Sequence, residues 1–165
     1  MKKKIIIIFI FSLILPFLFS NDKTFLINGS NIYIKIFSFY FPLTKNIGAF
    51  FQEYNKKLNL ELSMKKEDII NEPRSYPIFD SDLIIRIQDI PIDFNGNMNL
   101  PIILRHNKKV SLKNVEFTIF RRDKILILYG KLDNLKIGEL SDNIYLKNRF
   151  SWKYPLYFDL RIQIH

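Results

Sequence analysis

The sequence predicts an all-β domain that folds as an antiparallel barrel or, as the alternative, a β-sandwich. Apolar and polar residues alternate with a period of two along much of the chain after residue 23, which is typical of strands with one buried face. Turn-forming residues separate these runs at short intervals. The chain has no cysteine, so we expect the domain to be held by packing, without disulfides or thiolate metal ligands.

The N-terminal segment is typical of a secretory signal peptide. Lys2–Lys4 precede an apolar run, Ile5–Phe19, that is about 15 residues long and shorter than the roughly 20 residues of a membrane-spanning helix. A serine ends this run, so we expect residues 1–20 to be removed and residues 21–165 to form a single domain in the periplasm. The position three before the cut holds leucine in place of a small residue, so an uncleaved segment that tethers the domain to the inner membrane is the alternative.

Several segments of the mature chain alternate as strands do. Lys57–Met64 is the clearest, because every second residue in it is leucine or methionine. The other alternating runs are, in order, Asn31–Phe39, Leu83–Gln88, Asn114–Ile119 and Phe158–His165. Lys124–Leu132 is more evenly apolar, which predicts a strand covered on both faces.

Turns are expected at four polar breaks, and short helices at two places. The breaks are Asn28–Ser30, Asn95–Gly96, Arg121–Asp123 and Ser141–Asn143. The expected helical pieces are Lys65–Glu72, which a proline ends, and Ile47–Lys57.

The charge of the chain bears on its partners. The net charge of +9 falls to +6 when the signal peptide leaves with its three lysines. A basic surface can meet anionic lipid headgroups, anionic envelope polymers or nucleic acid. Because the chain is expected to be exported, we exclude nucleic acid and keep contact with a membrane surface as an alternative.

The residues that usually carry catalysis are sparse. Of the two histidines, His106 lies in a polar stretch that predicts a solvated loop, and His165 ends the chain. The acidic pairs Asp80/Asp82 and Asp89/Asp93 lie at predicted turns and lack the spacing of a calcium loop. Five glycines form no phosphate-binding loop. We therefore expect no enzyme activity, no metal site and no cofactor, and keep an envelope hydrolase that uses a pair of acidic residues as a third, weaker alternative.

Aromatic residues make up 15% of the chain, with sixteen phenylalanines and eight tyrosines. Rings of this size supply burial to a domain without disulfides, and they also line ligand cavities. The sequence leaves both roles open.

Four segments resemble the YceI-like family. Phe25–Ile36 is similar to the family's first hairpin, Tyr76–Leu83 to its Tyr-Pro-x-x-x-Phe-x-Ser segment, Gly96–Leu100 to its Gly-x-Leu-Thr-Ile strand and Lys109–Phe117 to the strand that follows. The family consists of exported bacterial proteins. The resemblance implies a lipocalin-like barrel that encloses a long isoprenoid-type lipid.

The function expected on these grounds is binding of an apolar or isoprenoid-type lipid in a barrel cavity. The alternative is a non-catalytic envelope interaction protein with a filled core and a basic surface. The strand alternation predicts which residues point inward and would contact such a ligand: Ile34, Ile36, Leu60, Leu62, Ile85, Ile87, Phe117, Ile119, Leu160 and Ile162.

Overall fold

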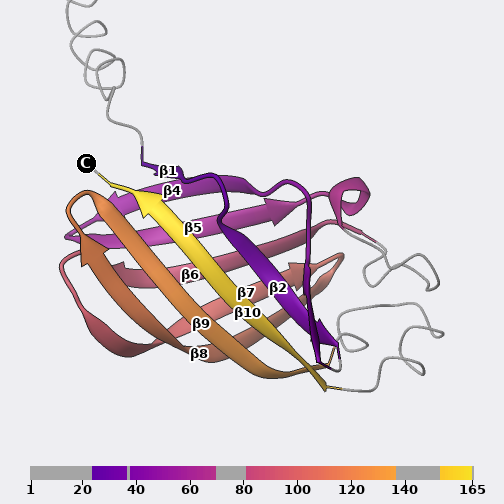
Figure 1. Ribbon diagram of the computed structural model, residues 1–165. Helices are drawn as coiled ribbons and strands as arrows, with labels where there is room; N and C mark the ends of the chain where they lie inside the picture. The colour runs from indigo at the N-terminus through magenta and orange to yellow at the C-terminus, as the bar shows by residue number, and fades with distance from the viewer. Residues whose placement is uncertain (1–23, 37, 70–80, 137–152, 165) are drawn as a thin grey trace, which may run out of the picture.

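The computed structural model describes residues 24–36, 38–69, 81–136 and 153–164. These residues form one antiparallel sheet of ten strands (Figure 1). In chain order the strands are β1 (Phe25–Leu26), β2 (Asn31–Ile36), β3 (Phe39–Pro42), β4 (Gly48–Tyr54), β5 (Lys57–Met64), β6 (Leu83–Pro91), β7 (Gly96–His106), β8 (Lys109–Arg122), β9 (Ile125–Lys136) and β10 (Lys153–Gln163). A short 3-10 turn, η1 (Lys66–Asp68), follows β5. No helix in the described ranges is long and apolar enough to cross a membrane.

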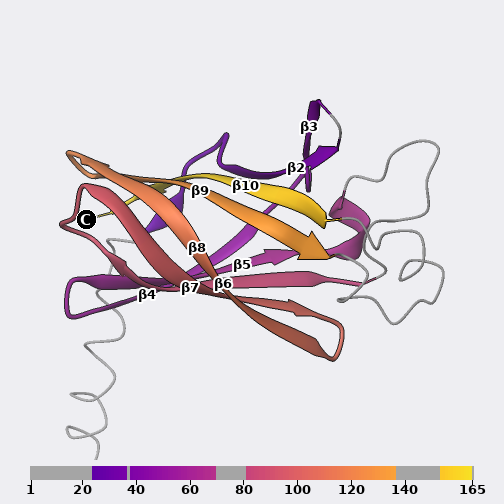
Figure 2. The same ribbon diagram turned by 90° about the horizontal axis from the view of Figure 1, so that it is seen from below.

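The strands follow the order β3-β2-β10-β9-β8-β7-β6-β5-β4 across the sheet. β1 pairs with the end of β10 and also lies beside β4, so the two sides of the sheet approach each other there. Figures 1 and 2 show that the sheet is strongly curled. The predicted all-β, antiparallel, barrel-like fold with little helix is confirmed.

The inner face of the curled sheet carries one apolar core. β5 shows the pattern most clearly, since its leucines and Met64 are buried while Lys57 and Ser63 are exposed. The same alternation continues through β6, β7, β8, β9 and β10, whose inward side chains join a single cluster. Period-two patterning therefore sets which face of each strand is buried.

A glycine in β9 makes room for the largest side chains of this core. Gly130 pairs with Phe117 of β8 and with Phe158 of β10. The two phenylalanine rings meet at 5.4 Å between centroids. A Cβ at Gly130 would lie 2.5 Å from Cδ1 of Phe117, so the ring occupies the space that a side chain would need.

Two expectations about helices and strands are wrong, and so is the expectation that Lys124–Leu132 is covered on both faces, since Tyr129 and Lys131 of β9 are exposed. Ile47–Lys57 is expected to be helical, but Gly48–Tyr54 forms β4 and pairs along its length with β5. Its burial pattern is almost entirely exposed, so it lacks the strict alternation that marks the other strands. Tertiary pairing with β5 overrides the weak local preference.

The second correction concerns Asn31–Phe39, which is one strand in the sequence prediction and two in the structure. β2 ends at Ile36, and β3 begins at Phe39 and folds back on β2. After β3 the chain crosses towards β5, where the backbone N–H of Lys45 donates to the carbonyl oxygen of Asp68 at 2.9 Å. Of the expected turns, Asn28–Ser30 lies where predicted, whereas Gly96 begins β7 and Arg121 and Arg122 belong to β8, so those two turns are displaced to residues 92–95 and 123–124. Ser141–Asn143 is outside the described residues.

Candidate functional site

The residues expected to contact a ligand lie on the inner face of the sheet. Nine of them are at most 1% exposed and belong to the one core cluster: Ile34, Leu60, Leu62, Ile85, Ile87, Phe117, Ile119, Leu160 and Ile162. The tenth, Ile36, ends β2 opposite Phe39, and its side chain is outside the described residues. The structure thus brings the nine described side chains together by packing them against one another.

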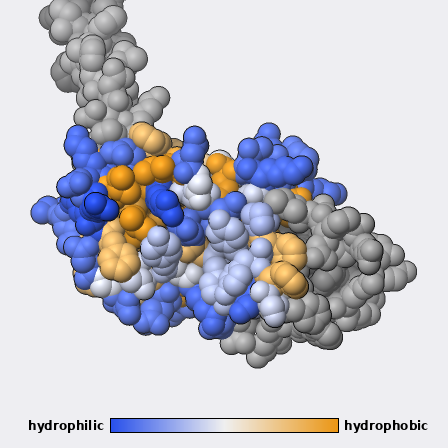
Figure 3. Space-filling model, viewed as in Figure 1, coloured by the Kyte–Doolittle hydropathy of each residue, from blue (hydrophilic) through white to orange (hydrophobic). Residues whose placement is uncertain are grey.

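A groove of about 580 Å³ lies on the opposite, outer face of the sheet. It runs over β2, β3, β7, β8, β9 and β10. Its lining combines four tyrosines with polar and charged residues and with Gly130 and Phe158: Tyr33, Tyr40, Asn97, Glu116, Thr118, Tyr129, Gly130, Lys131, Tyr157, Phe158 and Asp159. Figure 3 shows side chains of intermediate hydropathy gathered over the lower centre of this face, with more hydrophobic ones towards the upper left.

Strand register brings the groove side chains into rows. In one row Tyr33 of β2, Tyr157 of β10, Lys131 of β9 and Glu116 of β8 are direct cross-strand neighbours. Their neighbours along each strand are buried inner residues, so these four side chains stand on the outer face. The row crosses four strands, of which β2 lies far from β8, β9 and β10 in the sequence.

The next row along the strands is also polar. Asp159 of β10 pairs with Tyr129 of β9, and Tyr129 pairs with Thr118 of β8. Asn97 of β7 extends the row, because it pairs with Thr118. Tyr129 is 41% exposed and lines the groove.

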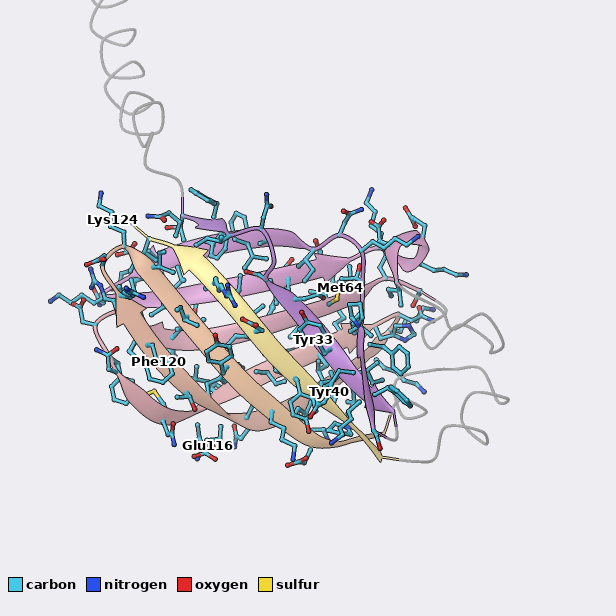
Figure 4. The ribbon with its side chains drawn as sticks, in the orientation of Figure 1. Tyr33, Tyr40, Met64, Glu116, Phe120 and Lys124 are labelled. Carbon is cyan, nitrogen blue, oxygen red and sulfur yellow. The ribbon has the colours of Figure 1, made fainter. Side chains whose placement is uncertain are left out.

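Tyr40 and Tyr157 form the aromatic end of the groove. Their rings stand edge to face at 5.0 Å between centroids. The ammonium of Lys35 lies 5.1 Å from the ring of Tyr40, and that of Lys131 lies 5.8 Å from the ring of Tyr157. Figure 4 shows Tyr33 and Tyr40 at neighbouring positions on the viewer's side of β2 and β10.

The hydrogen bond between Tyr40 and Tyr157 shifts their two pKa values in opposite directions. The hydroxyl of Tyr157 lowers the pKa of Tyr40, and the positive charges of Lys35 and Lys131 lower it further. Burial raises the pKa of Tyr157, and the hydrogen bond to Tyr40 adds to that rise. Tyr40 is therefore the member of the pair that ionises first.

Ion pairs fix the charged side chains at the rim. Lys131 pairs with Asp133 at 2.8 Å, and Asp133 raises the pKa of Lys131. Arg161 pairs with Asp159 at 3.4 Å, and Asp159 raises the pKa of Arg161. Both pairs are substantially exposed, so they orient side chains more than they stabilise the fold.

The chemistry that this groove offers is recognition. Phenol rings supply flat apolar surface with a polar end, and Asn97, Thr118, Glu116 and Asp159 supply hydrogen-bond donors and acceptors. Within the described ranges, no group of three or more histidine or acidic side chains is placed to hold a metal ion.

His106 lies away from the groove and does not form the solvated loop that its sequence context predicts. It ends β7, its side chain is buried, and its Nε2 lies 3.1 Å from the hydroxyl of Ser81. The prediction failed because the polar residues Asn107 and Lys108 follow His106 in the sequence. The side chain of His106 points to the inner face of the sheet, as that of Leu104 does two residues earlier. His165 is outside the described residues.

The groove tyrosines were not singled out as site residues by the sequence. Tyr33 and Tyr157 are visible in it as aromatic residues at outward positions of alternating strands. A large ring at an outward position is the signal that points to a surface site. Which outward rings meet depends on the pairing of distant strands, which no local pattern encodes.

No family model, curated protein or solved structure matches this chain. The resemblance to the YceI-like family therefore stays a prediction.

Proposed function

We propose that the protein is an exported, non-catalytic binding protein that holds its ligand on the outer face of the sheet. The observation that carries the proposal is the groove, where four tyrosines from β2, β3, β9 and β10 stand beside polar side chains. The packed inner cluster supports the same reading, because the side chains that would line an internal cavity contact one another. This is the filled-core alternative of the sequence analysis, now with a defined contact surface.

The ligand class that fits the groove best is a carbohydrate chain of the cell envelope. A sugar ring has an apolar face of C–H groups that stacks on an aromatic ring, and its hydroxyl groups both donate and accept hydrogen bonds. Tyr33 and Tyr129 offer rings, while Asn97, Thr118 and Asp159 offer the polar partners beside them. The groove is open and crosses several strands, as binding of an extended chain requires.

Titration with soluble peptidoglycan glycan strands, followed by two-dimensional NMR of the exported protein, tests this function. We expect amide shifts to concentrate in β2, β8, β9 and β10. Tyr129→Ala and Tyr33→Ala are expected to weaken binding about tenfold each, since a stacked ring contributes on the order of 1 kcal/mol or more. Tyr54→Ala is the matched control, because Tyr54 is 71% exposed on β4 outside the groove.

Shifts elsewhere, or equal losses for Tyr129→Ala and Tyr54→Ala, would count against the groove. A response to unstructured peptides and none to glycans would replace carbohydrate with peptide as the ligand.

The lipid-binding barrel remains the competing proposal, and the curled shape of the sheet favours it. The two functions differ in what co-purifies with the protein. Mass spectrometry of organic extracts from the exported protein is expected to show no lipid near stoichiometric amounts if the core is filled. A stoichiometric isoprenoid-type lipid would instead support the barrel cavity.

A further inference from the structure

A second surface lies at the turn between β7 and β8, away from the groove. The two strands form a long hairpin whose turn begins at Asn107, which has a φ of 55°. Figure 2 shows this turn at the lower right of the molecule. The segment Arg105–Asn114 around it contains four basic residues and no acidic one. This is a concentration of positive charge within ten consecutive residues.

Two apolar side chains are exposed beside this charge. Val110 is 64% exposed and Leu112 is 67% exposed, although both belong to β8. They are two residues apart, so they point to the same, outer face. Across the hairpin Val110 faces Arg105, and Leu112 faces the half-buried Ile103. The outer face of the hairpin end is therefore apolar with a basic border.

The pairing of β8 explains why these side chains are uncovered. Among the described residues, β8 pairs with β9 only from Glu116 to Arg122, whereas its pairing with β7 begins at Lys109. The first half of β8 thus extends beyond the end of its contact with β9. Apolar side chains on such an extension contribute little to the core, so packing among the described residues does not explain them.

We propose that the end of the β7–β8 hairpin docks the protein on an anionic lipid bilayer. Lys108 of the turn and Arg105, which pairs with Val110 on the outer face, would meet the negatively charged headgroups, and Val110 and Leu112 would enter the interface between headgroups and acyl chains. Charge complementarity selects an anionic bilayer over a neutral one. The expected net charge of +6 for the mature chain acts in the same direction.

The absence of cysteine from the chain makes a local test possible. Leu112→Cys in the exported protein, labelled with an environment-sensitive fluorophore, reports whether this position enters a bilayer, even if the N-terminal segment is retained. The vesicles are phosphatidylethanolamine with about a quarter phosphatidylglycerol, and phosphatidylcholine serves as the neutral comparison. Tyr54→Cys, on exposed β4, is the control label site.

We expect a blue shift for the label at position 112 with anionic vesicles, and none with neutral vesicles or at position 54. Adding Lys108→Glu or Arg105→Glu should raise the vesicle concentration needed by at least about fivefold, because one basic residue near an anionic surface is worth about that factor. No shift at position 112, the same shift with neutral vesicles, or equal shifts at both label sites would overturn the proposal. Circular dichroism of each variant shows that the sheet is retained, so a loss of shift is not a loss of fold.

Discussion

Gly130 is a single residue on which the packing of two core rings depends. The ring of Phe117 fills the space where a Cβ of residue 130 would be, and Phe117 is fully buried, so it has little room to move. Gly130→Ala should therefore lower the free energy of unfolding by about 1–3 kcal/mol, the usual cost of overpacking a core. Urea unfolding of the variant measures this.

A second substitution identifies the cause of that loss. Phe117→Leu alone creates space and is also destabilising. Combined with Gly130→Ala, it should cost less than the sum of the two single changes, because the space it opens accepts the new methyl group. Additive losses would mean that the ring is not what Gly130 accommodates.

The hydrogen-bonded pair of Tyr40 and Tyr157 gives the groove a measurable pH response. The pKa of Tyr40 is lowered, first by the hydrogen bond from Tyr157. An acid whose pKa is lower in the folded state stabilises the fold above its unfolded pKa of about 10, and this contribution is lost as the pH falls through the lower, folded value. Ionisation of Tyr157 has the opposite effect on stability and destabilises the fold at high pH, since burial raises its pKa.

Phenolate absorbance during an alkaline titration separates the two tyrosines. We expect the first groove tyrosine to ionise below the usual range, and Tyr157→Phe to move that step to higher pH because the hydrogen bond is lost. Tyr40→Phe should remove the step. Tyr54→Phe, which removes a hydroxyl outside the groove, should leave the step in place; if it does not, the early ionisation does not belong to Tyr40.

At the level of the strand, β6 contains a bulge that is held by one residue in an unusual conformation. Asp89 has a φ of 58°, and the register of β6 with β5 shifts beside it, between Leu58 and Leu60. The side-chain oxygen of Asn59 accepts a hydrogen bond from the backbone N–H of Asp89 at 3.0 Å. A bulge of this kind strengthens the local twist, which helps the sheet to curl.

The bulge predicts an order of stability among substitutions at residue 89. Asp89→Gly should change the free energy of unfolding by less than about 0.5 kcal/mol, because glycine tolerates positive φ and the ion pair with Lys57 is exposed. Asp89→Val should cost about 1–2 kcal/mol, since a β-branched residue resists that conformation. Urea unfolding of both variants measures the difference, and equal stabilities would show that the backbone relaxes out of the bulge.

Asp93 connects three hairpin turns at one end of the sheet. Its carboxylate pairs with Lys56 of the β4–β5 turn at 3.4 Å and with Arg121 at the end of β8. The backbone N–H of Arg121 donates to the side-chain oxygen of Asn95 at 2.6 Å. This is a second contact between the β6–β7 turn and the end of β8. The three turns therefore share polar contacts in addition to the apolar contact that Ile92 makes with the core.

Asp93→Ala should lower the free energy of unfolding by about 1 kcal/mol, and high salt should reduce the difference. The value is modest because Asp93 is half exposed and its ion pairs are screened by solvent. Asp133→Ala, which removes the exposed partner of Lys131, is the control and should cost less than about 0.5 kcal/mol. Equal losses would mean that Asp93 acts as an ordinary surface charge.

These strands show which parts of the fold can be predicted from the sequence and which cannot. Alternation fixed the inner face of β5, β6, β8 and β10, because burial of one face demands period two. Alternation did not predict β4, because a strand that is exposed on both faces needs no alternation of apolar and polar residues. It also placed His106 in a loop, because the residues around His106 are polar although His106 itself is buried. The groove could not be predicted from the sequence, because Tyr33 and Tyr157 become neighbours only through pairing of strands that are more than 100 residues apart.

For the whole molecule, the order of the strands predicts how stability is distributed. β8 and β9 lie in the middle of the sheet, whereas β4 ends it and pairs, within the described residues, with β5 alone. Local opening costs least where a strand has one neighbour and few buried side chains. Hydrogen exchange followed by NMR should therefore show amides of the β8–β9 ladder, such as Ile119, exchanging at least about a hundredfold more slowly than those of β4, such as Phe50.

Hydrogen exchange measured at two protein concentrations shows whether a second copy of the protein pairs with the edge strand β4. If β4 is an open edge, its fast exchange is independent of concentration. If β4 becomes protected as the concentration rises, a second copy pairs with it, since an exposed strand edge is a template for another chain. Exposed Phe50 and Tyr54 on this strand would then lie at that contact, and their substitution by lysine should restore fast exchange without affecting the β8–β9 ladder.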